Sequence, residues 1–338
     1  MNILFFSRRF HPYIGGVEKH VLEISKRLLK QGHVVTIITE AVAGSPKKET
    51  IEGIIVQRIN VGKEDRLKKF RIWKELFRLQ DLINDADIIH CHDVFFWYLP
   101  FRFLSPQKPV YTTFHGYESY PIAKKAISMR KLSERLSFGN LCIGDFIPKW
   151  YGTNPTYVSY GAVELPKKEN HVAVKKESAV FIGRLDEQTG ILTYVQAIAL
   201  LKKKYPKFEF IAVGDGDERK KIEQKVKVTG FQKNPERYFS TYHFAFVSRY
   251  LSILEAFAAK RLVIAVYDNP VKEDYLRMAP YAKWIVIEKT PEKIFEQVES
   301  LLANPQKEQK MVNAAYEWVA QQTWEKMIAT YLRLWKIK

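Results

Sequence analysis

The sequence contains few cysteines and no long hydrophobic run. Cys91 and Cys142 are its only two cysteines in 338 residues, too few for a disulfide-stabilised secreted domain. No stretch approaches the roughly 20 apolar residues that a membrane-spanning helix requires. The apolar start at Met1–Phe10 is short and ends in arginines and a phenylalanine, the reverse of a secretory signal. We therefore expect a cytoplasmic protein with two buried, reduced thiols.

The composition is that of a globular protein with a basic surface. Hydrophobic residues make up 46% and charged residues 27% of the chain, and the length suits two domains of about 150 residues each. The net charge of +17 is shared by both halves, which favours an anionic partner such as a nucleotide diphosphate, an acidic lipid or nucleic acid. A solvated, lysine-rich surface is the alternative. No RNA-recognition, KH or helix-turn-helix signature is present, so we expect no nucleic-acid partner.

Short β-branched runs alternate with helical patterns along the chain, which predicts parallel sheets with crossover helices. The expected strands of the first half are 3–6, 34–39, 54–59, 87–91, 110–114, 141–144 and 156–159, and the expected helices are 17–30, 68–83 and 123–137. Gly, Pro and charge then cluster at Tyr160–Lys168. The pattern restarts with strands at 178–182, 208–213, 226–229, 244–247 and 263–266, and helices at 192–204, 217–226, 253–260, 291–303 and 308–319.

This restart predicts an α/β protein with two Rossmann-like, doubly wound domains. The first domain covers residues 1–163 and the second covers 164–321. Apolar residues recur at helical spacing after Trp324, which predicts an amphipathic helix within 322–338. We expect this helix to complete the first domain.

Glycines and histidines follow the predicted strands of the first half. Gly15 and Gly16 precede a helix, where glycine lets backbone amides approach a ligand; an ordinary tight turn is the alternative. His90 and His92 in IIHCHD, and His115 in TTFHGYE, stand where parallel strands end, the usual ligand edge. A polar role at a site is favoured for His115 and a hydrogen-bonded core position for His90. The three histidines lack the carboxylate or cysteine pattern of a metal site, so no metal is expected.

Charged residues follow the strands of the second half. Arg184 in FIGRLDEQTG could pair bidentately with a diphosphate, or form a salt bridge with Asp186 or Glu187. A Gly-rich turn, GDG, lies at 214–216. Glu255 sits in an apolar helical run, and a buried carboxylate needs a partner, either ligand hydroxyls or an internal arginine.

Taken in this order, the motifs resemble those of the family 4 glycosyltransferases of the GT-B fold, in which two Rossmann-like domains face each other across a cleft. The resemblance covers nearly the whole chain. It rests on the Gly-Gly loop, the histidine of FHG, the GRL and GDG turns, VTGF at 228–231, and LEA before VIA. It implies a nucleotide-sugar donor, retention of anomeric configuration, no metal or other cofactor, and an acceptor such as a lipid-linked glycan or another glycoconjugate.

The resemblance also implies roles for individual residues. His115 would lie near the transferred sugar and Arg184 would hold the diphosphate, so these two are the expected catalytic residues. Gly16 would face the donor phosphates and the acceptor, Glu255 the ribose hydroxyls, and the backbone at Gly230–Phe231 the base. The expected donor-binding set is Gly15, Gly16, Arg184, Thr189, Gly230, Phe231, Ser252 and Glu255.

Three positions depart from the family pattern. Thr189 stands where a lysine is usual, Val247 where a first glutamate is usual, and Tyr160–Gly161 where the hinge strand usually carries asparagine-glycine. Two interpretations follow. One is an active sugar transferase, and the other is a non-catalytic binding or partner subunit that kept the fold.

The segment Glu64–Ile83 has the pattern of one amphipathic helix. Its apolar set is Leu67, Phe70, Trp73, Leu76 and Phe77, and its basic set is Arg66, Lys68, Lys69, Arg71 and Lys74. We hypothesise that it docks on an anionic membrane near a lipid-linked acceptor, which would make the protein peripheral at the inner membrane face. A core-facing stripe with a solvated basic face is the alternative.

Overall fold

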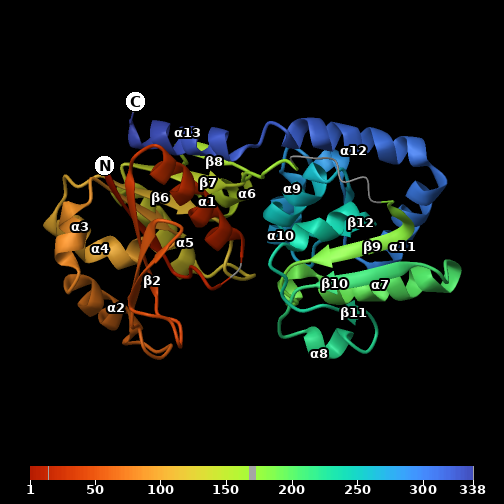
Figure 1. Cartoon of the computed structure of the whole chain (residues 1–338), viewed down its shortest axis with the longest axis horizontal. Coiled ribbons are helices and arrows are strands. Elements are labelled where there is room, and N and C mark those ends of the chain that lie inside the picture. The colour runs from red at the N-terminus through yellow and green to blue at the C-terminus, as the bar shows by residue number, and fades with distance from the viewer. Residues whose placement is uncertain (14, 167–172, 338) are drawn as a thin grey trace. The chain divides into compact units, whose positions relative to one another are not determined.

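The computed structural model describes residues 1–13, 15–166 and 173–337, and it divides into two compact units (Figure 1). Unit 1 consists of Met1–Tyr160 and Trp324–Lys338, and unit 2 consists of Gly161–Thr323. The predicted break at Tyr160–Lys168 begins where unit 1 meets unit 2 along the chain, although Lys167 and Lys168 lie outside the described residues. Each unit is a largely parallel sheet covered by helices, as the alternating pattern predicts.

Unit 1 contains an eight-stranded sheet in the order β3-β4-β2-β1-β5-β6-β7-β8. Its strands are β1 (Asn2–Ser7), β2 (Val34–Glu40), β3 (Lys48–Ile51), β4 (Ile54–Ile59), β5 (Ile88–His92), β6 (Val110–Phe114), β7 (Gly139–Ile143) and β8 (Tyr157–Ser159). All neighbours are parallel except β3 and β4, which form an antiparallel pair at the sheet edge. The sequence did not predict β3, because a four-residue edge strand beginning Lys48–Glu49 carries almost no apolar signal.

The described residues of unit 1 form seven helices: α1 (Gly16–Lys30), α2 (Lys68–Phe77), α3 (Gln80–Asp85), α4 (Phe95–Leu104), α5 (Lys124–Leu136), α6 (Phe146–Tyr151) and α13 (Trp324–Trp335). Side chains alternate across the sheet, because successive strand residues point to opposite faces. Leu4 and Phe6 join the core formed with α2, α3 and α4, whereas the ring of Phe5 contacts the rings of His90 and Trp335. Helix α13 thus covers the face of the unit 1 sheet that carries Phe5.

The prediction of one helix over Glu64–Ile83 is wrong. The structure has two helices, α2 and α3, separated at Arg78–Leu79. Helix α2 buries Ile72 and Leu76 against the sheet. Leu67 and Phe70 therefore fall on the outer side and are 61% and 52% exposed.

Unit 2 contains a six-stranded, fully parallel sheet in the order β11-β10-β9-β12-β13-β14. Its strands are β9 (Lys175–Ile182), β10 (Glu209–Val213), β11 (Lys227–Val228), β12 (Tyr242–Phe246), β13 (Leu262–Val266) and β14 (Val286–Glu288). Its α-helices are α7 (Ile191–Lys204), α8 (Arg219–Ile222), α9 (Tyr250–Ala258), α10 (Pro270–Arg277), α11 (Pro291–Ala303) and α12 (Pro305–Val319). The predicted helix at 217–226 was too long, since α8 has only four residues. Neither β14 nor α10 was predicted.

Both cysteines are buried, free thiols, as expected. Burial raises the pKa of the Cys142 thiol to about 12. Within the described ranges, no helix combines the length and the apolar character needed to cross a membrane.

Candidate functional site

Each sheet contains a point where the strand order reverses, and ligands of open α/β sheets bind beside such a point at the carboxyl ends of the strands. In unit 1 the reversal lies between β1 and β5, and in unit 2 between β9 and β12. In unit 2 the loops after β9 and β12 start at Gly183 and Val247. Arg184 and Ser252 follow these two strands, so the predicted donor-binding residues of unit 2 gather at this edge of its sheet.

The GRL and GDG turns of unit 2 are locked together by their backbones. Gly183 N–H donates to the Val213 carbonyl at 3.1 Å, and Leu185 N–H donates to the Asp215 carbonyl at 2.9 Å. Gly214 has φ +144°, and a Cβ there would lie 1.9 Å from the Gly183 carbonyl oxygen. Glycine is required at 214 because the two backbones approach too closely for any side chain.

We expect Gly214→Ala to destabilise unit 2 by more than about 1 kcal/mol, because both its φ and its Cβ position are forbidden to alanine. The measurement is the urea midpoint of unit 2, followed by hydrogen exchange of β9 and β10. Gly183→Ala is the matched control, since a Cβ there meets only Phe181 at 3.4 Å. Equal midpoints for both variants would contradict this explanation of the GDG turn.

Arg184 projects from the first of these turns, and its side chain is 54% exposed. It forms an ion pair with Asp186 at 3.3 Å, which is the salt bridge that the sequence offered as the alternative to a ligand contact. An exposed pair of this kind is weak, so the guanidinium remains available to a stronger anion.

Thr189, one of the predicted donor contacts, has its side chain turned inward. The residue is 3% exposed, and its hydroxyl reaches the carbonyls of Arg184 at 2.9 Å and Asp186 at 2.7 Å. Its N–H donates to Asp186 Oδ1 at 3.0 Å. These bonds make Thr189 the closing residue of the turn, and its hydroxyl is already used there.

Two cations that the sequence did not single out lie at the loop after β12: Arg249 belongs to this loop, and Lys272 reaches it from α10. Arg249 is half-buried and donates from Nη2 to Gln188 Oε1 at 2.8 Å, which ties this loop to the one after β9. Lys272 is 1% exposed, and its Nζ donates to the Ser248 carbonyl. Burial, and secondarily the charge of Arg249, lower the pKa of Lys272 well below its usual range. Lys272 thus holds the loop, whereas Arg249 lies on it.

The other predicted residues of unit 2 lie on nearby loops and on α9. Gly230 has φ +72° and pairs with Gly214 in an isolated bridge, and Phe231 beside it is 58% exposed. Ser252 donates from Oγ to the Ile182 carbonyl at 3.2 Å, next to the reversal point. Glu255 lies one turn further along α9 and is 7% exposed.

Gly15 and Gly16 follow the β1 loop of unit 1. Gly15 is extended at φ −171°, so its backbone does not require glycine. Gly16 is the first residue of α1, and a Cβ there would meet nothing within 4 Å. The local structure gives no packing reason for this glycine, which leaves an exposed backbone at the start of a helix.

Four histidines form one cluster in unit 1, with His20, His90 and His92 buried and His115 partly buried. His92 Nδ1 and His115 Nε2 are 2.9 Å apart, and the ring of His20 stands edge-on to His115 at 4.9 Å between centroids. His90 is hydrogen-bonded in the core, as expected. Burial lowers the pKa of His20 to about 3. Burial, followed by the neighbouring charges, lowers the pKa values of His90, His92 and His115 well below the usual range.

The backbone of His115 is held by residues that sequence reasoning missed. Asp93, at φ +61°, accepts a hydrogen bond from the His115 N–H at 3.0 Å. Arg130 donates from Nη2 to the Gly116 carbonyl at 2.5 Å and to Glu118 at 2.9 Å, with its guanidinium 3.8 Å from the centre of the Tyr151 ring. Loss of hydration raises the pKa of Asp93 to about 6. The sequence signal for Asp93 was limited to the position of a charged residue just after a predicted strand.

In the part of the chain that the structure describes, no group of three or more His, Cys, Asp or Glu residues is placed to hold a metal ion. The four histidines instead hydrogen-bond to one another and to neighbouring side chains.

Comparison with known proteins identifies both units. A model described as Glycosyltransferase Family 4 matches residues 14–141, and one described as Glycosyl transferases group 1 matches residues 164–318. An alpha-monoglucosyldiacylglycerol synthase of Acholeplasma laidlawii is 24% identical over 329 residues, covering 80% of this chain and 81% of that protein. A phosphatidyl-myo-inositol mannosyltransferase of Mycolicibacterium smegmatis is 23% identical over 244 residues, covering 64% of this chain and 59% of that protein.

Solved structures share the fold over the full chain. A sucrose-phosphate synthase from Thermosynechococcus elongatus superposes with a TM-score of 0.79 at 16% identity, covering 99% of this chain and 98% of that one. The two family matches and this fold confirm what the strand-end motifs predicted. The chain belongs to the family 4 type of glycosyltransferases, and its two Rossmann-like units are those of the GT-B fold.

Proposed function

We propose that this glycosyltransferase moves a sugar from a nucleotide-diphosphate donor to a lipid-linked or glycolipid acceptor, with retention of anomeric configuration. The observation that carries the proposal is the pair Arg184 and Arg249, on the two loops that flank the reversal point of the unit 2 sheet. Two guanidinium groups at adjacent strand ends suit a diphosphate, whose oxygens accept bidentate hydrogen bonds. Relatives named for diacylglycerol and phosphatidyl-inositol support a lipid acceptor.

The residues take the following roles in this proposal. Arg184 and Arg249 face the diphosphate, Glu255 accepts from the ribose hydroxyls, and the backbone at Gly230–Phe231 meets the base, with Ser252 beside the phosphates. In unit 1, Gly15 and Gly16 leave room for phosphates and acceptor, and His115 lies near the transferred sugar. The two guanidinium groups offset part of the diphosphate charge, and in this proposal the reaction proceeds without a metal ion.

Nucleotide binding tests the proposal directly. Uridine, guanosine and adenosine diphosphates are titrated into the full chain by calorimetry, with thermal shift as a second readout, because a ligand of the native state raises stability. One of them is expected to bind, and Glu255→Ala is expected to abolish binding while the circular dichroism spectrum stays unchanged. Glu292→Ala, an exposed glutamate at the start of α11, is the control. A parent protein that binds no nucleotide would instead favour a non-catalytic partner subunit.

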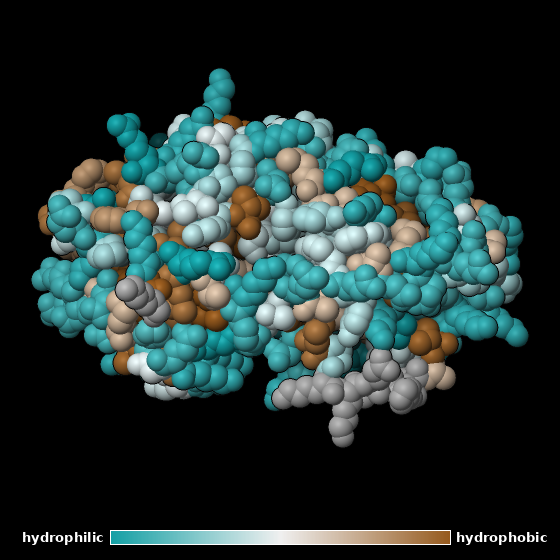
Figure 2. Space-filling model, turned by 90° about the horizontal axis from the view of Figure 1, so that it is seen from above, coloured by the Kyte–Doolittle hydropathy of each residue, from teal (hydrophilic) through white to brown (hydrophobic). Residues whose placement is uncertain are grey.

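We also propose that unit 1 docks on an anionic membrane through α2 and α4. Helix α4 packs beside α2, with Trp73 Nε1 donating to the Phe96 carbonyl at 2.9 Å. The exposed apolar side chains of the two helices form what we call the α2–α4 patch: Leu67, Phe70, Phe77, Phe103 and Leu104. Figure 2 shows one face of the molecule, where hydrophobic side chains gather in separate patches on a mostly hydrophilic surface. A patch that combines exposed aromatic and basic side chains is typical of interfacial binding.

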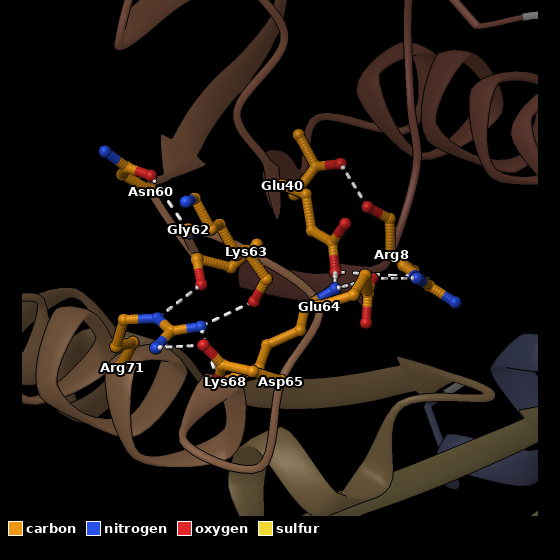
Figure 3. Close-up of polar contacts among 11 residues, drawn as sticks. Arg8, Glu40, Asn60, Gly62, Lys63, Glu64, Asp65, Lys68 and Arg71 are labelled. Carbon is orange, nitrogen blue, oxygen red and sulfur yellow. Dashed lines mark hydrogen bonds and ion pairs between the residues drawn. The ribbon is translucent and has the colours of Figure 1, made fainter.

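The basic residues around this patch divide into two groups. Figure 3 shows both Lys68 and Arg71 in ion pairs: Lys68 pairs with Glu40, at the end of β2, at 2.8 Å, and Arg71 pairs with Asp65, in the segment before α2, at 2.9 Å. These two residues anchor the start of α2. Arg66, Lys69 and Lys74 are exposed and supply the charge for anionic headgroups.

We expect Phe103→Ser/Leu104→Ser to weaken binding to vesicles containing phosphatidylglycerol by at least about tenfold, because two exposed apolar side chains no longer enter the lipid. Co-sedimentation with anionic and neutral vesicles is the measurement. Val158→Ser, an exposed apolar residue on β8, is the control. Equal binding of the parent to neutral and anionic vesicles, or no binding, would rule out this docking surface.

A further inference from the structure

Helix α13 reaches the histidine cluster through a continuous chain of buried hydrogen bonds. Trp335 Nε1 lies 3.0 Å from His90 Nδ1, and His90 Nε2 lies 2.7 Å from Thr113 Oγ1. Thr113 Oγ1 is 2.9 Å from the Tyr331 hydroxyl, which is 2.8 Å from His20 Nε2. All five side chains are buried. The chain therefore joins α13, β5, β6 and α1 without passing through solvent.

The first donor fixes the tautomer of His90. An indole N–H can only donate, so His90 Nδ1 must accept and the proton of this neutral imidazole lies on Nε2. His90 then donates to Thr113, whose hydroxyl can either donate to Tyr331 or accept from it. In the direction that continues from His90, Thr113 donates to Tyr331 and the Tyr331 hydroxyl donates to His20 Nε2, which places the His20 proton on Nδ1. The tautomer of His20 therefore distinguishes the two directions.

A second, shorter chain ends at His115. His92 Nε2 is buried and has no hydrogen-bond partner among the described residues. A buried lone pair without a partner costs less than a buried N–H without one, so the His92 proton lies on Nδ1. His92 therefore donates to His115 Nε2 at 2.9 Å. His115 must then carry its own proton on Nδ1, as a hydrogen-bond donor.

The two chains meet at His115. The rings of His20 and His115 are 4.9 Å apart at an interplanar angle of 80°, and the rings of His90 and His92 are 5.0 Å apart at 33°. We infer that α13 is a positioning element: Trp335 and Tyr331 fix the tautomers of His90 and His20, and the oriented His20 ring packs edge-on against His115 and holds that ring in place, while His92 sets the Nδ1–H tautomer of His115. Tyr331 and Trp335 touch neither donor nor acceptor in this scheme and act only through the histidines.

Substitution of Thr113 interrupts the hydrogen-bond chain with the least change in side-chain shape. Thr113→Val keeps the side-chain shape and removes the hydroxyl that joins His90 to Tyr331, whereas Thr113→Ser keeps the hydroxyl. Tyr331→Phe removes the last donor to His20. Tyr98→Phe is the matched control, since Tyr98 is a buried tyrosine of unit 1 whose hydroxyl has no hydrogen-bond partner among the described residues.

Nitrogen-15 spectra of the histidine side chains in the full chain read the tautomers directly. The eight histidines are assigned by single His→Gln substitutions. The parent is expected to show His90 protonated on Nε2, and His20 and His115 protonated on Nδ1. Thr113→Val and Tyr331→Phe are expected to mix the His20 tautomers and shift the His115 signals, while Thr113→Ser and Tyr98→Phe leave both unchanged. A parent His20 protonated on Nε2, or an unaltered His115 in Tyr331→Phe, would overturn the inference.

Of these tests, only the measurement of transferase activity depends on the proposed function. We expect Thr113→Val and Tyr331→Phe to lower kcat about tenfold with little change in donor KM. The reason is that the histidine cluster orients His115 toward the reacting groups and does not itself bind the donor. Thr113→Ser should restore most of kcat. A parent without transferase activity would refute the proposed function and leave the tautomers to decide the inference. Unchanged kcat in a variant with mixed tautomers would refute the positioning role.

Discussion

Acidification from pH 7 to 5.5 is expected to remove about 3–5 kcal/mol of the stability of unit 1. Burial lowers the pKa values of His20, His90 and His92 in the folded state, while an unfolded chain returns them to about 6.5. The histidines are thus neutral when folded and take up protons only on unfolding. Their contribution is complete above about pH 6.5 and falls as the pH drops below it, by about 1.4 kcal/mol per unit for each histidine.

One nearby group acts in the opposite direction. The pKa of Asp93 is raised to about 6, so protonation of this carboxyl stabilises the folded state as the pH falls from about 6 towards its unfolded value. One third of the Asp93 side chain reaches solvent, which reduces this effect. Three buried histidines lose stability as the pH falls to 5.5, against one carboxyl that gains it, so the histidine effect should dominate.

Urea titrations at pH 7 and 5.5, read through hydrogen exchange of β5 and β6, measure this loss. His90→Gln is expected to reduce the pH dependence by about one quarter to one third, because one buried imidazole no longer titrates. His11→Gln, an exposed histidine of the same unit, should leave the dependence unchanged. Identical urea midpoints at both pH values would show that the cluster is already protonated or open to solvent in the folded protein.

Removing both arginines at the unit 2 reversal point should nearly abolish nucleotide-diphosphate binding. A charge-assisted contact contributes about 1.5–3 kcal/mol, which corresponds to roughly 10–150-fold in affinity. Arg184→Ala and Arg249→Ala should each lose that factor. The double variant should lose more than either single variant, but the two factors should not simply multiply, because both guanidinium groups contact one diphosphate. Arg184→Lys should recover only part of the affinity, since an ammonium cannot make the bidentate contact.

Calorimetric titration of the diphosphate that binds the parent makes this measurement. Arg277→Ala is the control, because it removes the same charge from the same unit at an ion pair with Glu273. If Arg184→Ala weakens binding and Arg249→Ala does not, the diphosphate is held by Arg184 alone. Thr189→Lys is not expected to tighten binding, because a lysine there must break the turn that the threonine hydroxyl closes.

The sequence predicted the units well because buried parallel strands carry a strong apolar signal. The expected strands all occur, with ends that differ by a few residues. Edge and short elements such as β3 and α8 were missed or misjudged, because their few residues are largely polar. The division of Glu64–Ile83 could not be predicted, because the sequence gives the spacing of apolar residues and not which of them the sheet covers.

The site was only partly predictable for a related reason. The spacing of two between His90 and His92 places both on one face of a strand, and a closer use of this spacing would have predicted a cluster. The amphipathic pattern after Trp324 predicted a helix that buries Tyr331 and Trp335. It did not predict that their polar atoms meet His20 and His90, which are more than 200 positions away in the chain. Arg249 gave no signal, because it lies where the family motif is interrupted.

Placement of α13 on unit 1 has a consequence for synthesis on the ribosome. The strands that carry His90 and Thr113 emerge early, but the helix that covers them follows all of unit 2, Gly161–Thr323. At about 5–20 residues per second, roughly 8–30 seconds pass before α13 becomes available. During that interval one face of the unit 1 sheet, with Phe5 and the histidines, is without this covering helix. The nascent chain therefore has to complete its second unit before α13 can cover the sheet of its first.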